Sequence, residues 1–177
     1  MKYIALLRGI NVGGKSLVKM ANLRESVTKA GFTNVTTLIN SGNVIFESKI
    51  VNKSQISKSI EIAVSKILGK KIPIIIVTSE ELKKVVEESP SIWKKKNNLR
   101  CYIAFIKKPV EPDDVLKEIK LNPDVDLVEK GPGVLYMGTL LSGITKSGFS
   151  RLASKKIYQD ITIRNFKTVQ KLLDIII

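Results

Sequence analysis

The chain has 177 residues, of which 44% are hydrophobic and 26% charged, and its formal net charge is +14. This composition is typical of a folded globular protein, and the length suits one ordinary domain or two small ones. Because the chain has no histidine and a single cysteine, it excludes Ser-His and Cys-His nucleophile pairs, imidazole bases, and zinc sites built from histidine or several thiolates.

The first half of the chain predicts the element order β-α-β-β-α-β. Helical spacing of apolar residues predicts a helix from Lys19 to Ala30, which Gly31 ends, and a second helix around Ile60, which ends at Gly69. Short apolar or β-branched runs predict strands at 2–8, 34–39, 44–47 and 72–77, with a turn at 40–43. This order is that of the split βαβ unit of the ferredoxin-like fold.

The second half nearly repeats this order. We expect strands at 99–106, 125–128, 134–137 and 161–163, and helices at 80–88, 113–121, 147–158 and from about Phe166, with Asn165 as the N-cap of the last. The prediction is therefore an α+β protein with two ferredoxin-like (βαββαβ, α/β plait) modules, antiparallel sheets and a C-terminal helix. The expected boundaries are 1–79 for the first module, 80–98 for a helix and basic connector, and 99–177 for the second.

Residues Gly9 to Ser16 read G-I-N-V-G-G-K-S, which fits the phosphate-binding loop of many nucleotide hydrolases. Those enzymes place the loop in a parallel sheet, with an acidic residue on a neighbouring strand to hold magnesium. Here the apolar run 74–77 is followed by Thr78 and Ser79, and the strands on either side of the turn 40–43 form an antiparallel hairpin. We therefore predict that the protein is not a hydrolase of this type.

A different anion site is expected at the same loop. In a split βαβ sheet the first and third strands are neighbours, so the loop after Arg8 lies beside the turn at 40–43. Glycine-rich backbone amides and two cations at one end of a sheet favour an anion. The predicted ligand-binding residues are Arg8, Asn11, Gly13, Gly14, Lys15, Ser41 and Asn43. The alternative is that both loops are tight turns whose glycines supply positive φ.

A second candidate site lies where the last helix begins. Arg164, Asn165 and Thr168 could hold another anion. Alternatively, Arg164 bridges backbone carbonyls and Asn165 caps the helix, so that the motif only fixes the helix on its sheet.

Three stretches resemble a known family. L-L-R-G-I-N-V-G-G-K at 6–15 with I-N-S-G-N-V-I-F at 39–46, and I-T-I-R-N-F-K-T-V-Q-K-L at 161–172, are similar to the motifs of the bacterial domain of unknown function 1697 family. The resemblance implies a pair of α/β plaits and an activity that is not established. Phe166 stands where the family commonly has tryptophan.

Three classes of function remain open. The first is a non-catalytic binding module whose partner is nucleic acid or a phosphorylated small molecule, which the positive net charge favours. The positive charge has an alternative explanation, because the excess of lysine over arginine also fits codon bias on a solvated surface. Base stacking is doubtful, because the first and third strands offer only Tyr3 and Phe46, and the basic run from Trp93 to Arg100 is typical of a solvated linker. The second class is a small enzyme, independent of metal and histidine, that acts on an anionic metabolite and uses Lys15, Glu47, Tyr136 or Tyr158 as acid or base. The third is a protein–protein interaction module.

The sequence indicates no metal, no cofactor and no membrane partner. No apolar run approaches the about 18 residues that cross a bilayer, and the run before Arg8 is too short for a signal peptide. We therefore expect a cytoplasmic location, which the single cysteine also suits.

Overall fold

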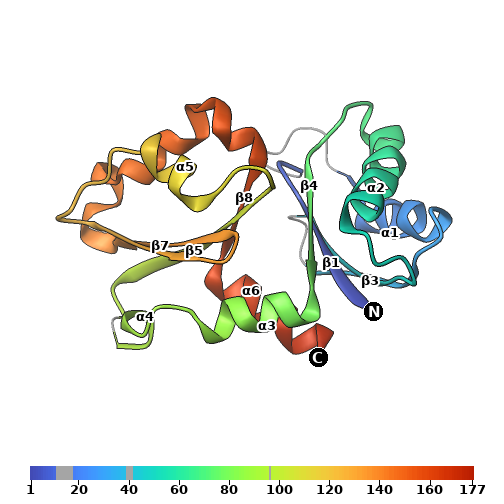
Figure 1. Cartoon of the computed structure of the whole chain (residues 1–177), viewed down its shortest axis with the longest axis horizontal. Helices are drawn as coiled ribbons and strands as arrows, with labels where there is room; N and C mark the ends of the chain where they lie inside the picture. Colours follow the sequence, from blue (N-terminus) through green and yellow to red (C-terminus); the bar gives the residue numbers. More distant parts are fainter. Residues whose placement is uncertain (11–17, 39–41, 96) are drawn as a thin grey trace. The chain divides into compact units, whose positions relative to one another are not determined.

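The computed structural model describes residues 1–10, 18–38, 42–95 and 97–177 (Figure 1). By packing, the chain forms two compact units: unit 1 comprises Met1–Leu82 with Leu172–Ile177, and unit 2 comprises Lys83–Lys171. The chain passes from unit 1 to unit 2 within helix α3 (Ser79–Glu87) and returns within helix α6 (Phe166–Ile176). The module boundaries expected above, at 79 and 98, stay a prediction.

Unit 1 contains a four-stranded sheet in the order β2-β3-β1-β4, in which every neighbouring pair is antiparallel. Its elements are β1 (Lys2–Leu7), α1 (Met20–Lys29), β2 (Thr33–Leu38), β3 (Asn43–Glu47), α2 (Lys53–Leu68) and β4 (Ile74–Thr78). The ferredoxin-like prediction is confirmed, including the pairing of the first and third strands. Helix α2 ends where expected, because Gly69 takes the left-handed conformation at φ +66°.

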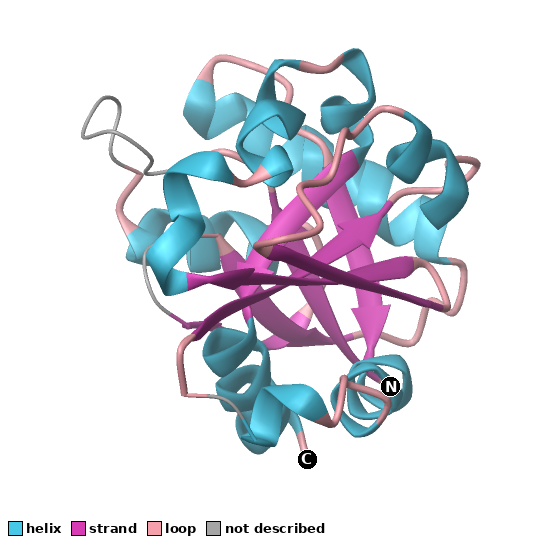
Figure 2. Cartoon of the chain, turned by 90° about the vertical axis from the view of Figure 1, so that its left-hand side faces the viewer, coloured by secondary structure: helices cyan, strands magenta, loops and turns pink. Residues whose placement is uncertain are grey.

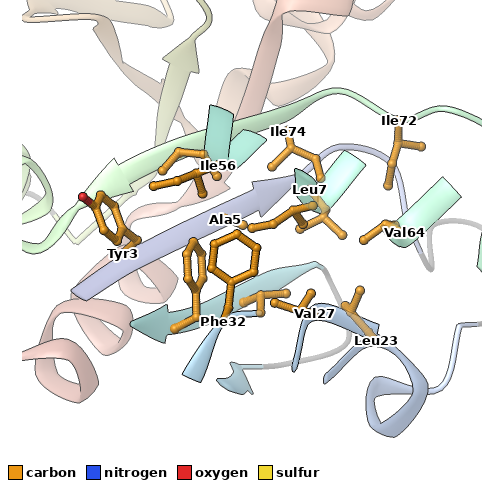
Figure 3. Packing of buried hydrophobic residues seen from close by; sticks show 14 of the residues in the cluster. Tyr3, Ala5, Leu7, Leu23, Val27, Phe32, Ile56, Val64, Ile72 and Ile74 are labelled. Atoms are coloured by element: carbon orange, nitrogen blue, oxygen red, sulfur yellow. The ribbon is translucent and has the colours of Figure 1, made fainter. Parts of the chain in front are cut away.

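The core of unit 1 lies between one face of this sheet and helices α1 and α2 (Figure 3). Side chains alternate along a strand, so Tyr3, Ala5 and Leu7 all face this core. The ring of Phe46 stacks on Tyr3 at 5.8 Å between centroids and meets Phe32 edge-on at 4.8 Å. Alternate residues of β1, Ile4 and Leu6, point to the opposite face and are also fully buried. Strand β1 is therefore buried on both faces, which explains its unbroken apolar sequence.

Unit 2 contains a second sheet with the same topology, β6-β7-β5-β8, again antiparallel throughout. Its strands are β5 (Leu99–Ile106), β6 (Asp126–Gly131), β7 (Val134–Leu140) and β8 (Ile161–Asn165), and its short helices include α4 (Ile92–Lys95) and α5 (Pro112–Lys117). Figure 2 distinguishes these strands, in magenta, from the helices, in cyan. The second ferredoxin-like module is thus confirmed, as is the helix that begins at Phe166.

The α-helix predicted at 147–158 is wrong. The chain instead forms three 3-10 helices, η1 (Leu141–Lys146), η2 (Gly148–Ser154) and η3 (Lys156–Asp160). Two serine hydroxyls explain part of the difference: Ser150 and Ser154 each donate to a carbonyl three residues earlier, at 2.8 Å, which competes with the α-helical pattern. Lys155, between η2 and η3, is extended at φ −86° and ψ 145°, so no continuous helix can pass through it.

Candidate functional site

Three segments of unit 1 meet at the end of β1. The Leu7 amide donates to the Gly42 carbonyl at 2.8 Å, and the Arg8 amide donates to the Pro73 carbonyl at 3.2 Å. The segment that leaves β1, the β2–β3 hairpin and the segment that leads into β4 therefore lie side by side. The predicted neighbourhood of Arg8 and the hairpin is thus confirmed, and the residues before β4 join it. We call this region the β1 exit.

The β1 exit has an unbalanced charge. The described residues of these segments, 8–10, 42–43 and 69–73, contain three cationic residues and no aspartate or glutamate: Arg8, Lys70 and Lys71. Lys70 and Lys71 are exposed, and neither forms an ion pair in the described part of the chain. Such a group of cations attracts anions. The carboxylate of Glu61, on α2, lies nearby, since it accepts a hydrogen bond from the Ile74 amide at 3.4 Å.

The predicted residues at this end fall into two groups. Arg8 is half-buried, whereas Asn43 is fully buried and its Nδ2 donates to the Leu38 carbonyl at 3.1 Å. Asn43 therefore holds the hairpin in shape. The others lie outside the described residues: Asn11, Gly13, Gly14, Lys15 and Ser41.

Sequence reasoning missed Lys70 and Lys71. The signal was available, because in the predicted topology the start of the fourth strand lies beside the end of the first. The strand was expected to begin at residue 72, directly after these two lysines.

Unit 2 provides an internal counterpart of the β1 exit. At the end of β5, the Ile106 amide donates to the Gly133 carbonyl at 3.0 Å and the Lys107 amide to the Asp160 carbonyl at 2.8 Å. The backbone geometry is the same, but the charges differ. Lys108 pairs with Glu111, and Lys130 pairs with Asp113 at 2.9 Å. Two lysines at this end of unit 2 thus have acidic partners, whereas Lys70 and Lys71 have none within the described residues.

Aromatic stacking plays no part in a binding site on unit 1. The aromatic residues of unit 1 are Tyr3, Phe32 and Phe46, and each is at most 2% exposed within the core. Proteins that bind single-stranded RNA on this fold stack bases on exposed sheet aromatics. The doubt about Tyr3 and Phe46 was justified, because their rings face helices α1 and α2.

Arg164 occupies a buried position in unit 2, at 8% exposure. It donates to the Thr162 hydroxyl at 2.9 Å and to the Ile163 carbonyl at 3.0 Å, and burial lowers the pKa of its guanidinium to about 10. It therefore remains charged at neutral pH, and its hydrogen bonds are structural. Thr168 is half-buried in the first turn of α6. Arg164 and Thr168 belong to unit 2, and Arg8 and Asn43 to unit 1.

Asn165 caps helix α6, as the sequence predicts. Its Oδ1 accepts a hydrogen bond from the Lys167 amide at 2.9 Å. We expect Asn165→Ala to lower the free energy of unfolding by about 1 kcal/mol, because a helix amide loses its partner. Urea unfolding measures this loss, and Asn165→Asp, which keeps the accepting oxygen, is the control. Unchanged stability in the alanine variant would contradict the capping role and favour a ligand site at Asn165.

The basic connector does not present a free aromatic side chain. Trp93, the only tryptophan, lies edge-on to Tyr136 at 5.8 Å and to Phe166 at 4.9 Å. Its half-buried ring packs over β7, because a Cβ on Gly138 would come within 3.3 Å of the indole nitrogen. The ring of Phe166 thus packs against Trp93, so this position keeps an aromatic packing role.

The candidate catalytic side chains are spread over both units, and one of them is buried. Tyr136 is 2% exposed and donates to the Val85 carbonyl at 2.9 Å, and burial raises its pKa to about 12, so it does not exchange protons near neutral pH. Glu47 belongs to unit 1 and Tyr158 to unit 2, and Lys15 lies outside the described residues. Within the described ranges, no group of three or more acidic or cysteine side chains could hold a metal ion, and every buried side-chain polar atom has a partner.

The sheet topology also differs from that of the nucleotide hydrolases. Strand β1 lies between β3 and β4, and both neighbours run antiparallel to it. A phosphate-loop hydrolase requires parallel neighbours. The motif at 9–16 is therefore not in the structural context that gives it its usual meaning; residues 11–16 themselves lie outside the described part.

Asp126, the first residue of β6, is a buried carboxylate that the sequence analysis does not single out. It is 7% exposed, and its carboxylate accepts hydrogen bonds from the Ser147 hydroxyl at 2.6 Å, the Gly148 amide at 2.8 Å and the Asn122 amide at 2.9 Å. The side chain thus ties the start of β6 to the start of η2. Its partners are all within the fold, so its role is structural.

None of the described helices is both long enough and apolar enough to cross a membrane.

No curated protein matches the sequence. The chain is similar over nearly its whole length to a solved structure, the conserved bacterial protein SP0830 from Streptococcus pneumoniae. The two share 28% sequence identity and superpose with a TM-score of 0.85, covering 99% of this chain and 98% of that one. The model of the family described as "Protein of unknown function (DUF1697)" matches residues 1–136. The match confirms the resemblance first seen in the motifs: the chain belongs to the DUF1697 family.

Proposed function

We propose that this protein is a non-catalytic binding module and that the β1 exit of unit 1 binds a phosphate-bearing ligand, a nucleotide or a nucleic acid. The observation that carries the proposal is the charge of this end: the described residues of the segments that meet there include Arg8, Lys70 and Lys71 and no aspartate or glutamate. The matching end of unit 2 has the same backbone hydrogen bonds, but there Lys108 pairs with Glu111 and Lys130 with Asp113. The excess charge is thus not a property of the fold.

Arg8 and the pair Lys70–Lys71 have distinct roles in this proposal. Arg8 is half-buried and its backbone amide is tied to Pro73, and a planar guanidinium suits a directed contact with phosphate oxygens. Lys70 and Lys71 are exposed and supply charge without fixed geometry. Lys15 and the glycines before it remain predicted contributors, and a cytoplasmic location remains the expected one.

The test compares two double variants that lose the same charge. Lys70→Ala with Lys71→Ala removes two lysines of the β1 exit, whereas Lys108→Ala with Lys130→Ala removes two paired lysines of unit 2. We measure the fluorescence anisotropy of labelled duplex DNA and single-stranded RNA, and the thermal stabilisation produced by ATP. For each ligand that the wild type binds, the Lys70/Lys71 variant should have an affinity lower by about tenfold or more, as expected for lost phosphate contacts. The control should lower the affinity by less than about twofold.

Equal weakening in both variants would mean that net charge alone sets the affinity, and the proposal would be wrong. Absence of binding to all three probes at about 50 mM salt, where counterion release favours complexes most, would also overturn it.

A further inference from the structure

Helix α2 leads directly into the β1 exit, and its exposed face is cationic. Lys58, Ile62 and Lys66 follow one another at intervals of four residues and are all exposed, with Ile62 at 52%. The opposite face, including Ile56 and Ile60, is buried in the core of unit 1. The lysines therefore line the solvent side of the helix, and the chain then continues to Lys70 and Lys71.

The acidic residues near α2 do not offset these lysines. Glu61, the only acidic residue of the helix, accepts hydrogen bonds from the Ser57 hydroxyl at 3.1 Å and the Ile74 amide at 3.4 Å, so it is directed toward β4. Glu81 pairs with Lys53. Within the described residues, no carboxylate pairs with Lys58 or Lys66.

The charge pattern is not explained by helix stability. The positive end of the helix dipole favours acidic residues in the first turn, yet the first turn of α2 contains none and carries Lys53. A lysine in the last turn, such as Lys66, suits the negative end of the dipole. Lys58 lies in the first half of the helix and receives no such benefit.

The length of this surface separates the candidate ligands. Lys58 and Lys66 are eight residues apart, about 12 Å along the helix axis, and Lys70 and Lys71 lie further on. Phosphates follow one another at about 3.4 Å of rise along one strand of duplex DNA. A mononucleotide presents its phosphates at one point, whereas the backbone of a polymer presents them over this length and can contact lysines along the helix and beyond it.

We infer that the face formed by Lys58, Lys66, Lys70 and Lys71 binds the phosphodiester backbone of a double-stranded nucleic acid. This inference rests on the proposed function, since Lys70 and Lys71 belong to the β1 exit. The duplex form follows from the aromatic residues of unit 1, which are all buried and cannot stack unpaired bases. Contacts to phosphates alone position a protein on a duplex without reading its sequence.

The deciding experiment uses the double variant Lys58→Ala with Lys66→Ala. Its control is Lys83→Ala with Lys84→Ala, which removes two exposed helical lysines that pair with Glu87 and Glu88. Circular dichroism and thermal unfolding verify that both variants fold. Anisotropy is then measured with labelled 20-base-pair DNA and RNA duplexes and with a single strand of the same length, and thermal stabilisation is measured with ATP.

The α2 variant should bind both duplexes about tenfold more weakly. Its plot of log affinity against log salt should be shallower, with a slope smaller in magnitude by about two. The control should change duplex affinity less than about twofold, and the wild type should prefer duplexes to the single strand. A preference for one duplex identifies the nucleic acid and supports the inference.

Unchanged duplex affinity in the α2 variant, with a loss in Lys70→Ala/Lys71→Ala, would overturn the duplex surface and leave the phosphate site standing. Tighter binding of the single strand would overturn the duplex form. If neither double variant alters binding, the proposed function fails as well.

Discussion

Asp126→Asn is expected to lower the free energy of unfolding by about 2–4 kcal/mol. The carboxylate accepts donors on both oxygens, with the Ser147 hydroxyl on Oδ1 and the Gly148 and Asn122 amides on Oδ2. An asparagine of the same shape replaces one of these oxygens by an NH2 group, which would point at a donor. Hydrogen bonds to a buried charged acceptor contribute about 1.5–3 kcal/mol each, and a donor left unpaired costs a further penalty.

Asp124→Asn is the matched control for this prediction. Asp124 lies two residues earlier, is exposed, and changes the net charge by the same amount when it is replaced. Its effect should stay within about 0.5 kcal/mol. Urea unfolding of both variants measures the difference, and equally small losses would show that the buried network around Asp126 does not hold η2 in place.

Gly42→Ala is expected to destabilise unit 1 more than Gly9→Ala does. Both glycines have positive φ, +81° and +65°, so each alanine incurs a conformational cost of about 1–2 kcal/mol. A Cβ at Gly9 would meet nothing within 4 Å. A Cβ at Gly42 would lie 2.8 Å from Ile10 Cγ1 and 2.9 Å from Leu7 Cβ. Leu7 and Ile10 are both buried, so the Gly42 variant adds a packing penalty of about 1–3 kcal/mol.

The pair of glycine variants also tests the geometry of the β1 exit. Gly42 accepts the hydrogen bond from Leu7 that brings the hairpin to the end of β1. Denaturant unfolding gives the two losses of stability. A loss at Gly42 no larger than at Gly9 would contradict the close approach of the hairpin to Leu7 and Ile10.

The sequence predicted the architecture well because its strongest signals are local. Gly69 and Asn165 act at the ends of α2 and α6 as expected, and the unbroken apolar run of β1 follows from a strand with two buried faces. The order of elements then selects the ferredoxin-like topology, since the second and third strands are joined by a short turn.

The errors arise where distant residues decide the structure. Asp126 is followed by ordinary strand residues. Its burial and hydrogen bonding depend on Ser147 and Gly148, about 20 residues later in the chain. The helix expected at 147–158 has apolar residues at helical spacing, but serine hydroxyls and the extended Lys155 divide it into 3-10 turns.

The candidate site was predicted only in part, for a related reason. Arg8 and the hairpin follow from the topology, whereas Asn43 looks like a ligand-binding residue in the sequence and is a buried structural residue in the fold. Lys70 and Lys71 resemble any other lysines of this basic chain. Their significance appears only when the charges of the two modules are compared at equivalent positions.

The most direct test of the proposed phosphate site is the salt dependence of duplex binding by the wild-type protein. The affinity for a labelled 20-base-pair DNA is measured between about 50 and 200 mM salt, since each phosphate contact contributes about −0.9 to the slope of log affinity against log salt. Contacts from Lys58, Lys66, Lys70 and Lys71 predict a slope of about −3 or steeper. A slope near zero, or no binding at the lowest salt, would contradict the account.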